Sequence, residues 1–139
     1  AEVYSRRAHT YELLNKIEKA HKDIESLLLI EPDNIEYRIK YIELSLFLGM
    51  EELVIKETDY LLNNVESEKI IKLLYFFKII AMTIINSDVT EEMTYIMKRM
   101  DEIEENPDYD IDIISKWLSK AKISKLQKNL IRNILSKLE

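Results

Sequence analysis

The 139-residue chain contains no cysteine, one glycine and two prolines. Without cysteine it can form no disulfide, no thiolate nucleophile and no cysteine-ligated zinc site. This absence suits the cytoplasm, which is the compartment that we expect. Strands and hairpins use glycine and proline freely at their turns, so a chain with only Gly49, Pro32 and Pro107 favours helices joined by short turns. The sequence therefore predicts an all-α protein.

A long apolar run is also missing. The most apolar segment, residues 70–85, is interrupted by Lys72 and Lys78. It is shorter than the roughly 20 apolar residues that a membrane span requires. We therefore expect this segment to form a buried helix, and we expect no membrane partner.

Motifs for catalysis and metal binding are scarce as well. One glycine is too few for a phosphate-cradling loop, and no Gly-x-Ser-x-Gly motif occurs. The histidines are His9 and His21, and the spacing Glu18-x-x-His21 alone supplies too few ligands for a di-iron site. We therefore predict two surface histidines, no metal, no cofactor and no enzymatic activity.

The overall composition is that of a folded domain, with 47% apolar and 33% charged residues. A single domain over residues 1–139 is long enough to bury a sizeable core without a metal or a disulfide. The net charge of −6 is uneven, because residues 1–107 carry −9 and residues 108–139 carry +3. An acidic body repels the phosphate backbone and argues against nucleic acid as a partner, and the basic C-terminal helix is the one feature that leaves it as an alternative.

The first 34 residues carry a regular pattern of large and small side chains. The large ones are Tyr4, Tyr11 and Ile24, the small ones are Ala8 and Ala20, and a proline follows at Pro32. In these places the segment resembles a tetratricopeptide repeat, a helix pair with a 34-residue period, and Arg7 is the clear departure. The resemblance covers residues 1–107 and weakens along the chain. It implies an α-α superhelix of about three helical hairpins followed by C-terminal capping helices.

Helical periodicity gives this pattern a physical basis. One apolar stripe contains Tyr4, Ala8 and Tyr11, and a second stripe follows after a polar break at residues 15–16. The small Ala8 and Ala20 would let the two helices approach closely. The second stripe consists of Ile17, Ala20, Ile24, Leu27 and Leu28.

Two further units follow, at about residues 35–68 and 69–107. We expect Asn34 to cap one helix, Gly49 to end it in the left-handed conformation, and Glu51 with Glu52 to open the next helix. A longer helix over residues 67–85 and another that begins near Thr90 form the third unit. Pro107 follows Pro32 by 75 residues and not by 68, so this unit carries about seven extra residues.

Residues 108–139 are expected to cap the array with two helices that meet at a bend near Lys120. Their apolar stripes are Ile111, Ile114, Trp117, Leu118 and Ala121, and then Leu126, Leu130, Ile134 and Leu138. We expect the first stripe to dock onto the helix that carries Met97 and Met100. A polar outer face would come from Lys116, Lys120, Lys125, Lys128 and Arg132.

In the tetratricopeptide family the first helix of each pair lines a concave groove that holds a peptide or a partner helix. The resemblance therefore implies a non-catalytic protein–protein interaction scaffold. Its carboxylates and apolar side chains imply a basic, amphipathic partner. The groove-facing places of this chain are occupied by Glu2, His9, Glu12, Leu13, Glu36, Ile39, Glu43, Leu46, Phe47 and Phe77.

Two alternatives remain open at this point. Leu46, Phe47, Phe77 and Ile80 are equally well explained as core, because the helix over residues 70–85 is apolar on nearly every side. The whole chain is also explained as an architectural segment of a longer helical solenoid, or as a homodimer without a peptide groove.

Overall fold

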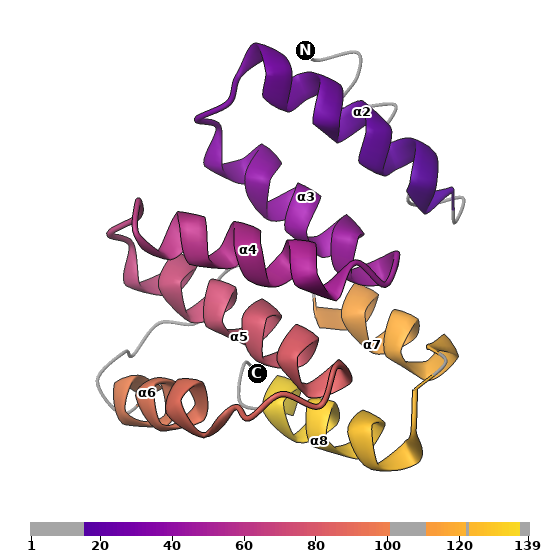
Figure 1. Cartoon of the computed structure of the whole chain (residues 1–139), viewed down its shortest axis with the longest axis vertical. Coiled ribbons are helices and arrows are strands. Elements are labelled where there is room, and N and C mark those ends of the chain that lie inside the picture. Colours follow the sequence, from indigo (N-terminus) through magenta and orange to yellow (C-terminus); the bar gives the residue numbers. More distant parts are fainter. Residues whose placement is uncertain (1–15, 101–110, 122, 137–139) are drawn as a thin grey trace. The chain divides into compact units, whose positions relative to one another are not determined.

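The computed structural model describes residues 16–100, 111–121 and 123–136 (Figure 1). Within these ranges the chain forms seven helices and no strand, so the predicted all-α class is confirmed. None of the described helices is both long and apolar enough to cross a membrane. The helices are α2 (Ile17–Ile30), α3 (Ile35–Phe47), α4 (Glu51–Leu62), α5 (Glu68–Ile84), α6 (Thr90–Met100), α7 (Ile111–Lys120) and α8 (Lys125–Ser136).

The chain divides into two compact units, and the boundary between Glu57 and Thr58 falls inside α4. In the first unit α2 packs against α3. Their contact confirms the predicted stripe, since Ala20, Ile24 and Leu27 are buried together with Leu44 of α3. Ile17, Leu28, Tyr37, Tyr41 and Phe47 pack around this cluster. Tyr4, Ala8 and Tyr11 lie outside the described residues.

The ends of α3 follow from local sequence. The side chain of Asn34 accepts a hydrogen bond from the backbone N–H of Tyr37 at 3.1 Å, which confirms the predicted N-cap. At the other end Gly49 has a φ of +74°, a conformation that L side chains rarely adopt. This conformation lets the N–H of Met50 reach back to the carbonyl of Ser45 at 2.9 Å and satisfy the helix end.

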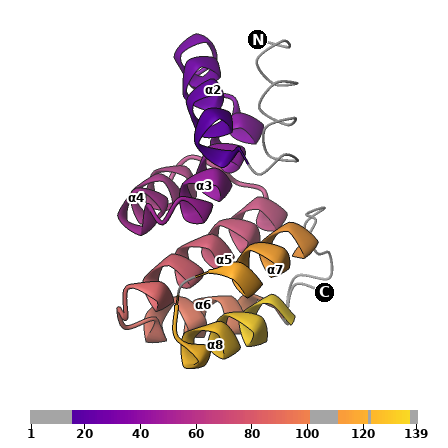
Figure 2. The ribbon, with the colours of Figure 1, turned by 90° about the vertical axis from the view of Figure 1, so that its right-hand side faces the viewer.

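The second unit is organised around α5. Both α6 and α8 pack against α5, and α7 packs against α8 (Figure 2). Ser67 caps α5, and the helix ends at Ile84, so the helix expected over residues 67–85 is confirmed. Asn86 then takes a φ of +60°, the role that Gly49 has after α3. Nine side chains of α5 are buried, namely Lys72, Leu73, Leu74, Phe76, Phe77, Ile79, Ile80, Ala81 and Thr83.

The C-terminal helices confirm the predicted break after Lys120, but they correct the face of α8 that packs inward. Ile134 of the expected stripe is buried as predicted, and the other buried side chains of α8 are Ile131 and Leu135. Leu126 and Leu130, which we expected on the buried stripe, are 70% and 45% exposed. Both stripes are apolar, and contact with α5 decides which one is covered. Leu138 lies outside the described residues.

The expected docking of α7 is also corrected. Ile114 and Leu118 are buried as predicted, but the helix that α7 packs against is α8. Met97 of α6, the expected surface for this contact, stays 44% exposed. The side chain of Met100 is outside the described residues.

Candidate functional site

The ten predicted partner-binding residues divide into those that the structure describes and those that it does not. Glu2, His9, Glu12 and Leu13 lie outside the described residues. The other six come from two helices. α3 supplies Glu36, Ile39, Glu43, Leu46 and Phe47, and α5 supplies Phe77.

Glu43 does not offer a free carboxylate to a partner. Its side chain is almost fully enclosed, and its Oε1 lies 2.9 Å from the ammonium group of Lys40. A buried carboxylate needs a partner of opposite charge, because leaving it unpaired away from water is costly. The lysine one helical turn earlier neutralises Glu43, so the expected row of open carboxylates is interrupted here.

The apolar residues Leu46 and Phe77 are also enclosed by the protein, as is Ile80. Of the two explanations that the sequence left open, burial favours the core for these three side chains. Phe47 is intermediate, because it is half-buried against the core cluster of the first unit.

Among the groove residues that the structure describes, those that reach the surface form a narrow strip on α3. Glu36 is exposed, and Ile39 and Phe47 are half-buried. Glu36 lies in the first turn of α3, where its charge also favours the helix dipole. The strip combines one carboxylate with two partly accessible apolar side chains.

A buried cluster of polar side chains around His21, in the first unit, was not predicted. His21, which we expected at the surface, is buried between α2 and α3 and is a correction of the sequence-based expectation. Its Nε2 lies 2.9 Å from the hydroxyl of Ser45, and its Nδ1 lies 3.2 Å from Glu25. The ring also stacks on Tyr41, with 4.6 Å between the centroids.

These contacts indicate which tautomer of His21 satisfies both of its ring nitrogens. A carboxylate only accepts, so Nδ1 of His21 carries the proton towards Glu25, and the Ser45 hydroxyl then donates to Nε2. Burial lowers the pKa of His21, and the nearby Glu25 charge opposes that shift. Burial also raises the pKa of Tyr41, and the charges of Glu25 and Glu57 add to the effect.

The order serine, histidine, carboxylate is that of a nucleophile, a base and an orienting acid. A nucleophile must reach its substrate, however, and Ser45 is fully buried in the middle of α3. Ser45 and Glu25 instead satisfy the two ring nitrogens of a histidine that is buried in the α2–α3 contact. In the Glu18-x-x-His21 spacing, both ring nitrogens of the histidine therefore already have partners, Ser45 and Glu25.

The second unit has a charged surface where α5 meets α6. The ammonium group of Lys78 lies 2.9 Å from Asp59 and 3.4 Å from Glu92, and these two carboxylates raise its pKa despite partial burial. Arg99 contacts both carboxylate oxygens of Glu68 at 2.7 Å. These ion pairs link α4, α5 and α6, and they are adequately explained as contacts between helices.

Metal-ligating side chains do not gather in the described part of the chain: no group of three or more histidine, aspartate or glutamate side chains there could hold an ion. Comparisons with protein-family models, with curated protein sequences and with solved structures found no match. A function for this chain is therefore inferred from its own residues.

Proposed function

We propose that the chain is a non-catalytic, tetratricopeptide-like scaffold that binds a segment of another protein. The observation that carries the proposal is the spacing of the helices. α4 begins 34 residues after α2, and α5 begins 33 residues after α3. The tetratricopeptide helix pair has a period of this length. The spacing supports an α-α superhelix in which alternate helices line one binding surface.

The longer third unit fits the same plan with one local change. α5 has 17 residues and α3 has 13, so α5 is longer by about one helical turn. This turn accounts for four of the seven residues by which the third unit exceeds the period. A lengthened helix keeps its place in a repeat array while it extends the surface that the array offers.

The partner that suits α3 is a basic, amphipathic peptide or helix. Glu36 would attract a lysine or arginine, and Ile39 and Phe47 would contact apolar side chains. Because Lys40 already neutralises Glu43, Glu36 carries the attraction in the described part of the surface. Charge would mainly speed the encounter, and apolar contact would supply most of the affinity.

The test uses a synthetic peptide with lysine and leucine at helical spacing, labelled for fluorescence anisotropy. Glu36→Lys should slow association several-fold at low salt. Glu52→Lys is the matched control, since Glu52 is also exposed and also lies in the first turn of its helix, α4. The two variants change the net charge and the helix dipole equally, so a difference between them reports the position alone.

Two results would count against the proposal. Equal binding of the peptide by both variants and the wild type, across salt concentrations, would exclude the α3 strip as the site. Binding of a peptide with glutamate in place of lysine, at the same affinity, would show that the carboxylate has no part in recognition.

One observation favours the architectural alternative, in which the chain assembles with further helices in a solenoid or a homodimer. Leu29 and Ile30 at the end of α2 are largely exposed, as is Leu126 of α8. None of these residues belongs to the α3 strip, and exposed apolar side chains are the kind of surface that contact with further helices would cover.

A further inference from the structure

The C-terminal end of α2 exposes two neighbouring apolar residues, and the turn that follows exposes two carboxylates. Leu29 is 86% exposed and Ile30 is 60% exposed. Glu31 and Asp33, which follow them, are exposed as well. We call these four residues the acidic tip. Single exposed apolar residues are common on protein surfaces, but two adjacent ones at the end of a helix form a small contact surface.

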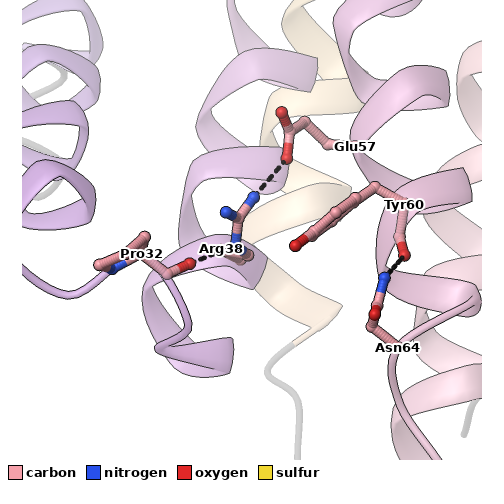
Figure 3. Close-up of polar contacts among 5 residues, drawn as sticks. All are labelled: Pro32, Arg38, Glu57, Tyr60 and Asn64. Atoms are coloured by element: carbon pink, nitrogen blue, oxygen red, sulfur yellow. Dashed lines mark hydrogen bonds and ion pairs between the residues drawn. The ribbon is translucent and has the colours of Figure 1, made fainter.

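Arg38 holds the backbone at Pro32, which lies between Glu31 and Asp33 of the acidic tip (Figure 3). Its Nε donates to the carbonyl of Pro32 at 2.6 Å, and its Nη1 donates to Glu57 at 3.1 Å. The N–H of Asn34 donates to the carbonyl of Glu31 at 3.2 Å. A surface that is already ordered loses less conformational entropy when it binds. The backbone of the tip is therefore held in a fixed conformation.

The outward side of α8 has the complementary character. Leu126 and Leu130 are four residues apart and therefore lie on one side of the helix, exposed. Lys125 and Arg132 are exposed on the same helix, and its rotation of about 100° per residue places them on the opposite edge of the outward side. We call these four residues the basic face. α8 itself is anchored to α5, because Ile131, Ile134 and Leu135 are buried and Gln127 donates to the carbonyl of Ile84.

The charges of the two surfaces are opposite, and each surface has two apolar side chains. The acidic tip carries two carboxylates, and the basic face carries an ammonium and a guanidinium group. The same asymmetry runs through the sequence, with −9 over residues 1–107 and +3 over residues 108–139. Complementary charge raises the rate of encounter and selects the partner, and apolar contact holds it.

We propose that the acidic tip of one copy of this chain docks onto the basic face of a second copy. The contact is head-to-tail, because it joins different surfaces of identical chains. The pair as a whole keeps one free tip and one free face, so association continues into a ring or an open chain. This self-assembly uses neither Glu36 nor the α3 strip, and it is independent of the proposed peptide binding.

The mass of the wild-type chain in solution tests the proposal directly. Sedimentation velocity from micromolar to near-millimolar concentration should show a weight-average mass that rises above 16.6 kDa, more steeply at low salt. Lys125→Glu with Arg132→Glu should weaken this association about tenfold at low salt without removing an apolar side chain. Lys98→Glu with Lys116→Glu, at exposed lysines of α6 and α7, is the charge control: it changes the net charge equally and should weaken the association less.

Mixing two variants distinguishes a head-to-tail contact from a symmetric one. Leu29→Ser with Ile30→Ser removes the tip, and Leu126→Ser with Leu130→Ser removes the apolar part of the face. Each variant alone should stay at 16.6 kDa. Their equimolar mixture should form a species of twice that mass, because each variant keeps the surface that the other lacks. Met97→Ser, at another exposed apolar residue, should associate as the wild type does.

Three outcomes overturn the proposal. They are a wild-type chain that keeps the mass of one copy at the highest concentration, association that survives either pair of serine substitutions, and a mixture of the two variants that stays monomeric. The replaced side chains are exposed, so the variants should fold, and circular dichroism checks this. If a serine variant loses helicity, the charge variants decide the question. The proposal is overturned if the Lys125→Glu, Arg132→Glu variant and its charge control both self-associate as strongly as the wild type does.

Discussion

Replacing Gln127 with glutamate tests how α8 is held on α5. The side chain does two things. Its Oε1 accepts from the N–H of Ser124 at 3.2 Å while the Ser124 hydroxyl accepts from the N–H of Gln127 at 3.1 Å, which caps the start of α8. Its Nε2 donates to the end of α5, with acceptors at Thr83 O (3.2 Å), Ile84 O (2.9 Å) and Asn86 Oδ1 (3.1 Å).

The magnitude follows from what Gln127→Glu keeps and what it removes. A carboxylate still caps α8, and its charge near that helix start is worth about 0.3–1 kcal/mol in favour of the variant. The amide has two hydrogens, so at most two full hydrogen bonds are lost, at about 0.5–1.5 kcal/mol each. The carboxylate also faces the negative end of the α5 dipole, which costs about 0.3–1 kcal/mol and offsets the gain at α8. We therefore expect a net loss of about 1–3 kcal/mol.

Urea unfolding followed by the fluorescence of Trp117 measures this loss, since the single tryptophan lies in α7 of the same unit. The midpoint should fall without a change in slope. Asn129→Glu is the control, with the same charge change at an exposed residue two positions along α8. The loss should shrink below about pH 4, where a protonated carboxyl can again donate. If Gln127→Glu matches the control or the wild type, the hydrogen bonds to α5 contribute nothing.

Three further perturbations test the core and the turn. In the unfolded chain His21 binds a proton near its ordinary pKa of 6.5, whereas burial lowers its pKa in the folded protein, so the free energy of unfolding should fall as the pH drops below 6.5 and stay level above it. Thermal melts of His21→Gln should lose this pH dependence, and a variant with the same pH profile as the wild type would contradict the prediction. Gly49→Ala should lower the free energy of unfolding by about 1–2 kcal/mol through backbone strain alone, because the nearest atom to an added Cβ is 3.9 Å away and causes no clash. If urea unfolding shows a loss well below about 1 kcal/mol, the turn adapts to the alanine. Phe77→Ala should lower the free energy of unfolding by about 3–5 kcal/mol if the side chain belongs to the core. Near-wild-type stability in the same assay would indicate that Phe77 faces the predicted groove.

The helix boundaries could be predicted from the sequence because local chemistry determines them. Asn34 and Ser67 cap helices with their own side chains, and Gly49 adopts a conformation that few other residues tolerate. None of these features needs a distant partner. The apolar stripe of α2 was also predictable, since Ala20, Ile24 and Leu27 recur at helical spacing and are buried together.

What covers each helix was decided only by the tertiary structure. α8 carries apolar residues on adjoining stripes, and packing against α5 buries Ile131 and Leu135 while Leu130 stays exposed. His21 and Glu43 look like surface residues in the sequence because each is charged or polar. They are buried because Ser45, Glu25 and Lys40 lie within hydrogen-bonding or ion-pairing distance. Periodicity shows that a face is apolar, but only the neighbouring helix determines which polar groups find partners and can be buried.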